Sequence, residues 1–316
     1  MTLHTDQSLH EVDRLMHALA GRDFLGRIAA EQLAGGGRRT RAHLALAAGR
    51  ALCVPNAVAW AAACELLHNA TLVHDDLQDG DRVRRGRPTA WAAYGSAHAI
   101  NAGDLLLMLP LQAIHQQAAT ATQRNALVAA LATRAVASVR GQADDLELPH
   151  GDWSFSAWEK AAHGKSGQLL ALPVEGAAIL ADRPDYRSCG DVFAQAGVLY
   201  QLVDDLVDLY GDKGRGEVGN DIREGKISAL VTRHVERRPQ DRPWLKHVLA
   251  TQRDRTTRQD IARVARRFEA SGAVGAVQTD IQARLTELAS DTVPEALRPI
   301  ATQVALRCTR DLETLK

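Results

Sequence analysis

The sequence predicts an all-α protein. Alanine and leucine dominate its 316 residues, prolines number only 10, and few segments combine β-branched residues with strict alternation. Apolar residues instead recur every three or four positions, the period of a helix with one buried face. In the segment 192–209 this apolar stripe consists of Val192, Ala196, Leu199, Val203 and Leu206. The aspartates of the segment lie outside the stripe.

Interruptions of the helical period predict the connections. Glycine and charged residues break the pattern at 35–37, 80–88, 150–154 and 211–225, where we expect loops. No linker, repeat or low-complexity tract divides the chain, so we expect a single helical domain over residues 1–316.

Composition narrows the classes of function. The 38 basic and 38 acidic side chains cancel, which argues against a global attraction to nucleic acid or to an anionic membrane surface. The first residues contain no apolar signal-peptide core, and uncharged runs such as 51–64 are shorter than the roughly 20 residues of a spanning helix. We therefore expect a cytoplasmic protein without a transmembrane segment. Any anionic ligand would be held by cationic groups at one site and not by the net charge of the chain.

Two aspartate clusters share one spacing. At about 100° per residue, the first and last aspartates of each cluster lie on nearly the same helix face, with the middle one beside them. The second cluster lies within an otherwise apolar helix, where uncompensated negative charge would be costly. The two clusters comprise Asp75, Asp76 and Asp79, and then Asp204, Asp205 and Asp208.

These clusters predict a magnesium site. Mg²⁺ takes oxygen ligands and typically bridges carboxylates to substrate phosphates. Neither cluster contains cysteine or histidine, which argues against zinc. The structural alternative is a solvated helix face or a partner for nearby arginines, and it would be preferred for a single cluster. Two clusters, each after an apolar helical run, favour the metal site.

Cationic residues near the clusters could hold phosphates. Three arginines follow a triple glycine, and four more crowd the loop after the first cluster, where ion pairing with Asp79 and Asp81 is the structural alternative. His68 precedes Asp75 by two helical turns on about the same face, although a lone helical histidine is usually structural. These residues are Arg38, Arg39 and Arg41, then Arg82, Arg84, Arg85 and Arg87, and further along the chain Lys165 and Lys226.

The ordered series of motifs resembles the trans-isoprenyl diphosphate synthases, which include the farnesyl, geranylgeranyl and longer polyprenyl synthases. The resemblance extends over residues 35–230 and comprises GGRRTR at 36–41, ELLH at 65–68, HDDLQD at 74–79, RRGRPT at 84–89, KSG at 165–167, QLVDDLVD at 201–208 and DIREGK at 221–226. It implies an all-α bundle of the isoprenoid synthase type around a deep central cavity, with the two clusters facing each other across its mouth. It also implies a homodimer.

The resemblance further implies a head-to-tail condensation of isopentenyl diphosphate with an allylic diphosphate. Three Mg²⁺ ions, with Mn²⁺ as an alternative, would be held by Asp75, Asp76, Asp79, Asp204 and Asp208, and more weakly by Asp205. Arg84, Lys165 and Lys226 would bind the allylic diphosphate; Arg38, Arg41, His68 and Arg85 would bind isopentenyl diphosphate; Ser166 and Gln201 would lie near the developing cation.

Three positions depart from the family pattern. Arg38 stands where the family usually has lysine, and Ala42 where it usually has proline. Glu217 stands where many members direct a lysine at the allylic diphosphate, and Lys213 and Arg215 are the candidates to replace that charge.

Small residues before the first cluster predict a long product. Similar synthases block the growing chain with an aromatic residue four or five positions before the first aspartate, where this chain has Thr71 and Ala70. We therefore expect geranylgeranyl diphosphate or a longer product, and farnesyl diphosphate is less favoured. A deeper floor could be formed by Trp60, Leu67, Met108 or Leu109.

Two other functions remain open. A class I terpene cyclase also ionises a prenyl diphosphate, but its second metal motif normally contains Asn or Asp, Ser or Thr, and Glu, and it needs no second diphosphate site such as the one expected at Arg38 and Arg41. A non-catalytic partner subunit would have degraded aspartates, whereas all six are present. Glu217 is the feature that keeps the second alternative open.

Overall fold

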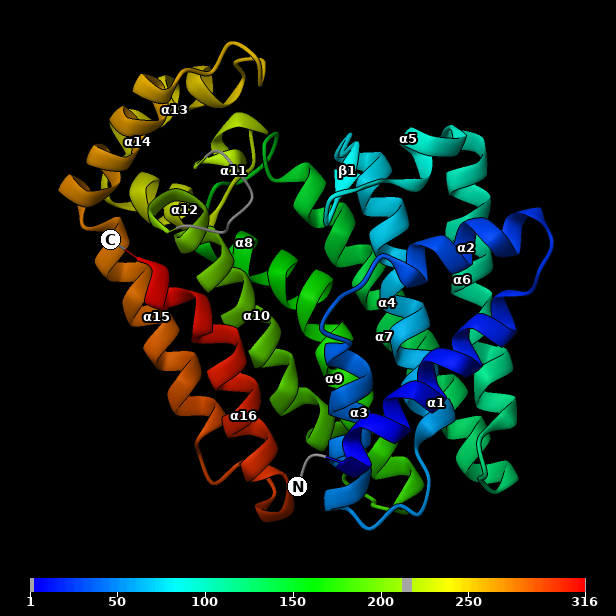
Figure 1. The fold of residues 1–316 in the computed structure, drawn as a ribbon. Helices are drawn as coiled ribbons and strands as arrows, with labels where there is room; N and C mark the ends of the chain where they lie inside the picture. Colours follow the sequence, from blue (N-terminus) through cyan, green and yellow to red (C-terminus); the bar gives the residue numbers. More distant parts are fainter. Residues whose placement is uncertain (1–2, 212–217, 316) are drawn as a thin grey trace. The chain divides into compact units, whose positions relative to one another are not determined.

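The computed structural model describes residues 3–211 and 218–315, and over these residues the chain is helical with one short hairpin (Figure 1). The predicted all-α class is confirmed. The chain divides into two compact units, Met1–Ala135 with Leu169–Gly190 and Val136–Gln168 with Asp191–Lys316. The single domain over residues 1–316 stays a prediction.

The first unit contains six complete helices and the hairpin. Helices α7, α9 and α10 each begin in one unit and end in the other. The elements of the first unit are α1 (Leu3–Ala20), α2 (Phe24–Ala34), α3 (Thr40–Ala51), α4 (Val58–Gln78), β1 (Val83–Arg84), β2 (Arg87–Pro88), α5 (Ala90–Tyr94) and α6 (Ser96–Gln116), and the shared helices are α7 (Ala121–Glu147), α9 (Gln168–Leu180) and α10 (Tyr186–Tyr210).

The second unit contains shorter helices around α10. Its remaining elements are α8 (Phe155–Ala162), the π-helical turn η1 (His163–Gly167), α11 (Asn220–Arg223), α12 (Ala229–Arg237), η2 (Pro239–Asp241), α13 (Arg242–Leu249), α14 (Arg258–Ser271), α15 (Ala273–Leu288), η3 (Glu295–Leu297), α16 (Arg298–Thr309) and η4 (Arg310–Thr314).

Helix α4 is the centre of the first unit. It packs against α1, α3 and α6, and its alanine-rich middle is buried on nearly every side. Trp60 is fully buried and its indole N–H donates to the Pro173 carbonyl over 3.0 Å. Gly176 makes room for this ring, because a Cβ there would lie 2.0 Å from the indole. Residues 52–57 are not helical, so the uncharged run 51–64 begins at the last residue of α3 and enters α4 at Val58.

Local signals fix several helix starts. Asp23 caps α2 by accepting the Gly26 N–H over 2.7 Å, and Ser154 and Ser228 cap α8 and α12 in the same way. Thr257 and Asp260 form a capping box at the start of α14. These side chains satisfy backbone N–H groups that have no partner within their helices.

The predicted connections at 35–37 and 150–154 are confirmed as non-helical segments. The connection at 80–88 contains the β1–β2 hairpin, in which Val83 pairs with Pro88 and Arg84 with Arg87. The connection at 211–225 includes the short helix α11. Residues 212–217, which include Lys213, Arg215 and Glu217, lie outside the described residues.

No helix in the described ranges is both long enough and apolar enough to cross a membrane.

Candidate functional site

The first aspartate cluster lies at the carboxyl end of α4. Asp75 and Asp79 are partly exposed, whereas Asp76 is only 1% exposed. Asp79 is the first residue past the helix, and its N–H donates to the Asp75 carbonyl over 2.8 Å. Two carboxylates of the cluster therefore reach solvent, and the third is covered by protein.

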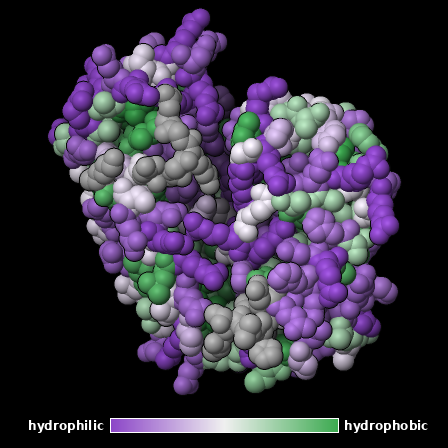
Figure 2. All heavy atoms as spheres, viewed as in Figure 1, coloured by the Kyte–Doolittle hydropathy of each residue, from purple (hydrophilic) through white to green (hydrophobic). Residues whose placement is uncertain are grey.

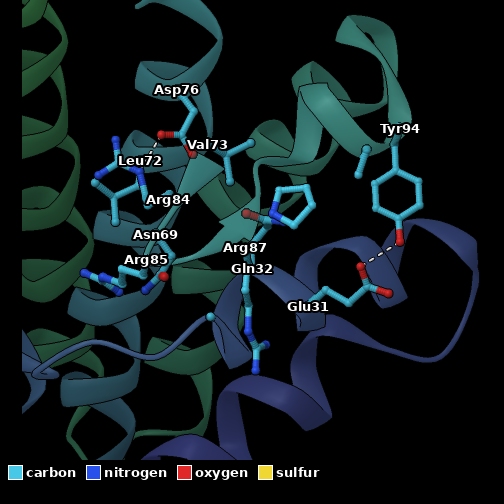
Figure 3. A pocket seen from close by; sticks show the side chains of 13 residues that line it. Glu31, Gln32, Asn69, Leu72, Val73, Asp76, Arg84, Arg85, Arg87 and Tyr94 are labelled. Atoms are coloured by element: carbon cyan, nitrogen blue, oxygen red, sulfur yellow. Dashed lines mark hydrogen bonds and ion pairs between the residues drawn. The ribbon is translucent and has the colours of Figure 1, made fainter. Parts of the chain in front are cut away.

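Arg84 is the cationic partner of this cluster. The β1–β2 hairpin returns toward the end of α4, and Arg84 Nε donates to Asp76 Oδ1 (Figure 3). The Arg84 Nη2 also lies 3.7 Å from Asp75 and 3.9 Å from Asp81. The structural alternative for this loop, ion pairing with Asp81, is thus present for Arg84, together with contacts to two members of the cluster.

Burial controls the charge of Asp76. Removal from water raises the pKa of Asp76 from 3.8 to about 6, while Arg84 acts in the opposite direction. A buried carboxylate requires positive charge beside it, and Arg84 supplies that charge in this structure.

The hairpin also carries Arg85 to the glycine-rich connection between α2 and α3. Arg85 Nη1 donates to the Gly36 carbonyl, and Arg87 Nη1 donates to the Ala34 carbonyl over 3.3 Å. Gly37 has a φ of +132°, and a Cβ at this position would lie 2.4 Å from the Arg85 guanidinium. The positive φ favours glycine at 37, and any larger residue there would push the Arg85 guanidinium aside.

The three arginines after the glycines differ in their surroundings. Arg38 is exposed. Arg39 adopts a left-handed conformation with φ +43° and donates to Asp13 over 2.9 Å and to the Leu33 carbonyl over 2.6 Å. Its contacts lie within the helical packing of the first unit. This position is the one that the resemblance leaves without a substrate-binding role.

Arg41 and His68 lie together. The Arg41 Nη1 is 3.1 Å from the His68 Nε2. A guanidinium can only donate, so Nε2 must accept and the ring proton must reside on Nδ1. Burial, and then the positive charges of Arg41, Arg85, Arg84 and Arg39, lower the pKa of His68 well below its usual value. His68 is therefore a neutral ring whose Nδ1 is buried and has no hydrogen-bond partner among the described residues.

A pocket of about 380 Å³ lies beside Arg84 and Asp76 in the first unit (Figure 3). Asn69, Leu72 and Val73 of α4 form part of its wall, and α2, Gly35, the hairpin and α5 form the rest. On the side of α2 and α5, Tyr94 donates to Glu31 over 2.6 Å. Of the predicted site residues, its lining includes Asp76, Arg84 and Arg85.

The second aspartate cluster lies near the carboxyl end of α10 and holds backbone groups of the segments that follow. Asp205 and Asp208 are each 5% exposed, although they lie off the predicted stripe, because α10 is covered on more than one side. Asp205 Oδ2 accepts the Ala229 N–H over 2.7 Å at the start of α12. Asp208 Oδ2 accepts the Asp221 N–H over 3.0 Å in α11. Asp204 is partly exposed.

The KSG motif forms a π-helical turn between α8 and α9. π-helical turns occur frequently at functional sites because they redirect side chains within a helix. Lys165 donates to Asp145 over 2.9 Å, and the Ser166 hydroxyl donates to Gln201 over 3.2 Å. The structure thus joins Ser166 and Gln201, which the resemblance to the synthases places near the developing cation.

Glycines allow the turn to approach its neighbours. A Cβ on Gly141 of α7 would lie 2.2 Å from the backbone nitrogen of Lys165. A Cβ on Gly197 of α10 would lie 2.4 Å from the backbone of Gly167. Further along the second unit, Lys226 lies 3.0 Å from Glu224. The two lysines assigned to the allylic diphosphate are thus both in ion pairs within this unit.

Comparison with known proteins agrees with this arrangement. The Polyprenyl synthetase family model matches residues 22–267. The chain belongs to the polyprenyl synthetase family. It is 33% identical over 186 residues to a short chain isoprenyl diphosphate synthase of Methanocaldococcus jannaschii, covering 58% of this chain and 57% of that protein.

Two further relatives of this polyprenyl synthetase differ in their products. An all-trans-nonaprenyl-diphosphate synthase of Rhodobacter capsulatus is 34% identical over 215 residues, covering 64% of this chain and 65% of that protein. The matches thus span less than two thirds of the length of both curated relatives. The crystal structure of geranylgeranyl pyrophosphate synthetase from Pyrococcus horikoshii has a TM-score of 0.83 at 23% identity, over 96% of this chain and 97% of that one. The predicted isoprenoid synthase fold is confirmed.

The donor atoms of this polyprenyl synthetase fit magnesium. Both clusters offer only carboxylate oxygens, and the buried carboxylate of Asp76 already binds a cationic group. Over residues 3–211 and 218–315, no three His, Cys, Asp or Glu side chains are already gathered around one point. In this structure Asp76 is turned toward Arg84. The convergence of three carboxylates in the first cluster stays a prediction.

Several partner residues of this polyprenyl synthetase were missed from the sequence. Glu65 is buried, accepts the Ala42 N–H over 3.1 Å, and lies 4.0 Å from Arg39. Asp145 and Glu224 pair with the two lysines described above. Glu65 lies one helical turn before His68, and this spacing is the signal that could have identified it. Asp145 is 20 residues from Lys165, so no local pattern connects them.

Proposed function

We propose that this polyprenyl synthetase condenses isopentenyl diphosphate with an allylic diphosphate, head to tail, to give a longer trans-prenyl diphosphate. One observation carries the proposal: the acidic end of α4 lies in the same unit as His68 and the guanidiniums near it, Arg41 at 3.1 Å among them, and burial together with these positive charges lowers the pKa of His68. Carboxylates suit metal ions, and guanidiniums suit diphosphate.

Isopentenyl diphosphate would bind at Arg38, Arg41, His68 and Arg85. The neutral His68 presents its Nδ1–H as a donor, and a phosphate oxygen would satisfy this buried group. Arg41 and Arg85 supply charge-assisted hydrogen bonds on either side of the glycine-rich connection. Arg85 is held there by Gly36.

The allylic diphosphate would be held by Arg84, Lys165 and Lys226. Their present carboxylate partners would give way as the diphosphate takes over the cationic groups. Asp75, Asp76 and Asp79, together with Asp204 and Asp208, would hold magnesium ions, with a smaller contribution from Asp205. When bound, these ions would neutralise the charge that grows on the departing diphosphate.

The reaction balances without a protein base. The allylic carbon–oxygen bond breaks, and its electron pair leaves with the diphosphate. The double bond of isopentenyl diphosphate then attacks the allylic cation, and the released diphosphate takes the proton lost in forming the new double bond. Ser166 and Gln201 would orient their oxygens toward the cation, where their mutual hydrogen bond fixes both side chains.

Small side chains near the first cluster support a product of geranylgeranyl length or longer. Ala70 is fully buried in the core, whereas Thr71 is partly exposed and donates to the His68 carbonyl over 2.8 Å. Thr71 is therefore the position that would meet the growing chain. Trp60, Leu67 and Leu109 are buried and suit a deeper floor, whereas Met108 is 58% exposed and does not.

The protein would act as a homodimer. Helix α6 exposes Ile100, Met108 and Leu111, which are 46%, 58% and 42% accessible. Helix α7 adds Val128 and Val139, which are spaced to lie on one face. Exposed apolar residues gathered along helices are typical of an interface, and a second copy would cover them.

The decisive experiment incubates the protein with Mg²⁺, isopentenyl diphosphate and each allylic starter, and identifies products by mass spectrometry. We expect chain elongation that EDTA abolishes, and Thr71→Phe should shorten the product. Release of a hydrocarbon in the absence of isopentenyl diphosphate would instead identify a terpene cyclase. Turnover that appears only after addition of a second synthase would identify a partner subunit. Either result would overturn the proposal.

A further inference from the structure

The chain has a strongly basic segment outside the candidate site. Residues 237–267 contain ten arginine and lysine residues and three acidic residues, although the two charges balance over the whole chain. The segment covers the end of α12, η2, α13, the connection that follows, and the first part of α14. Nine of the ten basic residues are exposed. The outer surface of this region is mainly hydrophilic in Figure 2.

The helices of this basic segment turn their apolar faces inward. Leu245 and Val248 of α13 and Ile261 and Val264 of α14 are buried. The opposite faces carry the arginines, so the basic residues gather on the outside of the second unit. No large hydrophobic residue between 237 and 267 is exposed. Any partner must therefore be attracted by charge and not by apolar burial.

Two of the three acidic residues within the basic segment have structural partners. Asp241 lies 2.9 Å from Arg267 and 3.1 Å from His234. Asp260 is used by the capping box with Thr257. Ten basic residues against three acidic ones give the segment a net charge of +7, so its outward field is positive.

The basic segment surrounds an open pocket of about 740 Å³ in the second unit. Three arginines, one aspartate and three neutral polar residues line it: Arg223, Arg253, Arg258, Asp254, Asn220, Thr256 and Thr257. Arg253 donates to Glu224 over 2.8 Å, so one side of the pocket is already neutralised. Guanidiniums and hydroxyls are the groups that bind phosphate oxygens. The pocket therefore suits a phosphate group.

We propose that the basic segment, residues 237–267, docks this protein onto bilayers of anionic phospholipids, with lipid phosphates held at the arginine pocket. The choice of a bilayer rests on the proposed function, because a product with a long hydrocarbon tail must pass from the protein into an apolar phase. Nucleic acid fits less well, since single strands are bound on exposed aromatic rings. Trp244, the aromatic residue of the segment, is covered by the guanidiniums of Arg263 and Arg267, 5.3 and 4.3 Å from its ring centre.

Sedimentation with lipid vesicles tests this proposal. The full chain should sediment with vesicles rich in phosphatidylglycerol and remain in solution with phosphatidylcholine alone. Binding should disappear in about 0.5 M salt, because the attraction is electrostatic and the Debye length falls to a few ångströms. Sedimentation needs no substrate, so an active protein that ignores both vesicles would overturn the docking proposal and leave the proposed function intact. A protein that binds phosphatidylglycerol vesicles but shows no synthase activity would overturn the proposed function and leave the docking proposal intact.

A matched pair of triple variants locates the surface. Arg255→Gln, Arg258→Gln and Arg266→Gln together should weaken partition on the order of a hundredfold, since each arginine near an anionic surface contributes about fivefold. The control carries Arg50→Gln, Arg187→Gln and Arg307→Gln, which remove three exposed arginines elsewhere and should leave partition close to wild type. Thermal melting confirms that both variants fold.

Two outcomes of these experiments count against the bilayer. Equal loss of binding in the two triple variants would show that net charge, and not this surface, drives the interaction. Binding of a single-stranded oligonucleotide without binding of phosphatidylglycerol vesicles would assign the surface to nucleic acid.

Discussion

The two aspartate clusters have the same spacing but different local surroundings. In the first unit, the buried carboxylate of Asp76 is matched by a side chain, Arg84, which extends from a hairpin. In the second unit, the buried carboxylates of Asp205 and Asp208 accept backbone N–H groups of α12 and α11. The Arg84 side chain can move away and leave the carboxylate to another cation. A backbone N–H group cannot move away without disturbing the helix to which it belongs. The same spacing therefore serves structural support through backbone groups in the second cluster, whereas the buried carboxylate of the first cluster is matched by a side chain.

The largest expected effect tests what the clusters share. Asp75→Asn and Asp204→Asn should each lower kcat about a hundred- to a thousandfold, because each removes negative charge needed to hold magnesium against the leaving diphosphate. Steady-state kinetics with saturating isopentenyl diphosphate measures this loss. Asp81→Asn is the matched control, because Asp81 also lies near Arg84 but belongs to neither cluster. Equal activity of the first two variants and the control would remove the clusters from the reaction.

The next effect tests what separates the clusters. Asp205→Ala should lower the free energy of unfolding by about 1–3 kcal/mol, because it leaves the buried Ala229 N–H without an acceptor. Asp205→Asn keeps an acceptor oxygen and should retain most of that stability. Urea unfolding measures both variants. Asp75→Ala should change stability far less, since Asp75 lies 3.7 Å from Arg84 and is partly exposed. A loss at Asp75 equal to that at Asp205 would contradict the comparison.

The glycine-rich connection provides a smaller effect in the first unit. Gly37→Ala should raise the KM for isopentenyl diphosphate about tenfold, because the new Cβ displaces the Arg85 guanidinium. Gly36→Ala also places alanine at a positive φ, here +78°, but its Cβ meets no atom within 4 Å. The control therefore reports backbone strain alone. Equal KM values for the two variants would show that the position of Arg85 does not matter for binding.

The smallest effect concerns the pH dependence of stability. The pKa of His68 is lowered in the folded state, so the unfolded chain binds the proton first as pH falls below 6.5. The stabilising contribution of neutral His68 is present above this pH and declines below it, with a slope of at most about 1.4 kcal/mol per pH unit. His68→Gln should remove that slope. Urea unfolding of the wild type and of His68→Gln between about pH 5 and 7, the range in which histidine titrates, measures the difference. Parallel curves of the free energy of unfolding against pH would contradict a lowered pKa of His68.

The candidate site was predicted unevenly by the sequence. Local spacing was sufficient to place candidate residues of one helix together, as for His68 and Asp75 of α4, whose roles stay a prediction. It was insufficient for partners that come from other elements, because contacts such as Lys165 with Asp145 join α7 to the π-helical turn. Neither the roles of the site residues nor the number of metal ions follows from spacing alone.

The amino-acid sequence by itself determined that the chain is helical, where its main connections lie, and to which family it belongs, because helical period, glycines and ordered motifs are local properties. Only the tertiary structure decided that Arg84 covers Asp76, that Asp205 and Asp208 hold backbone groups, and that the arginines of 237–267 gather on one surface. Burial and charge depend on residues distant in sequence, and packing alone brings those residues together.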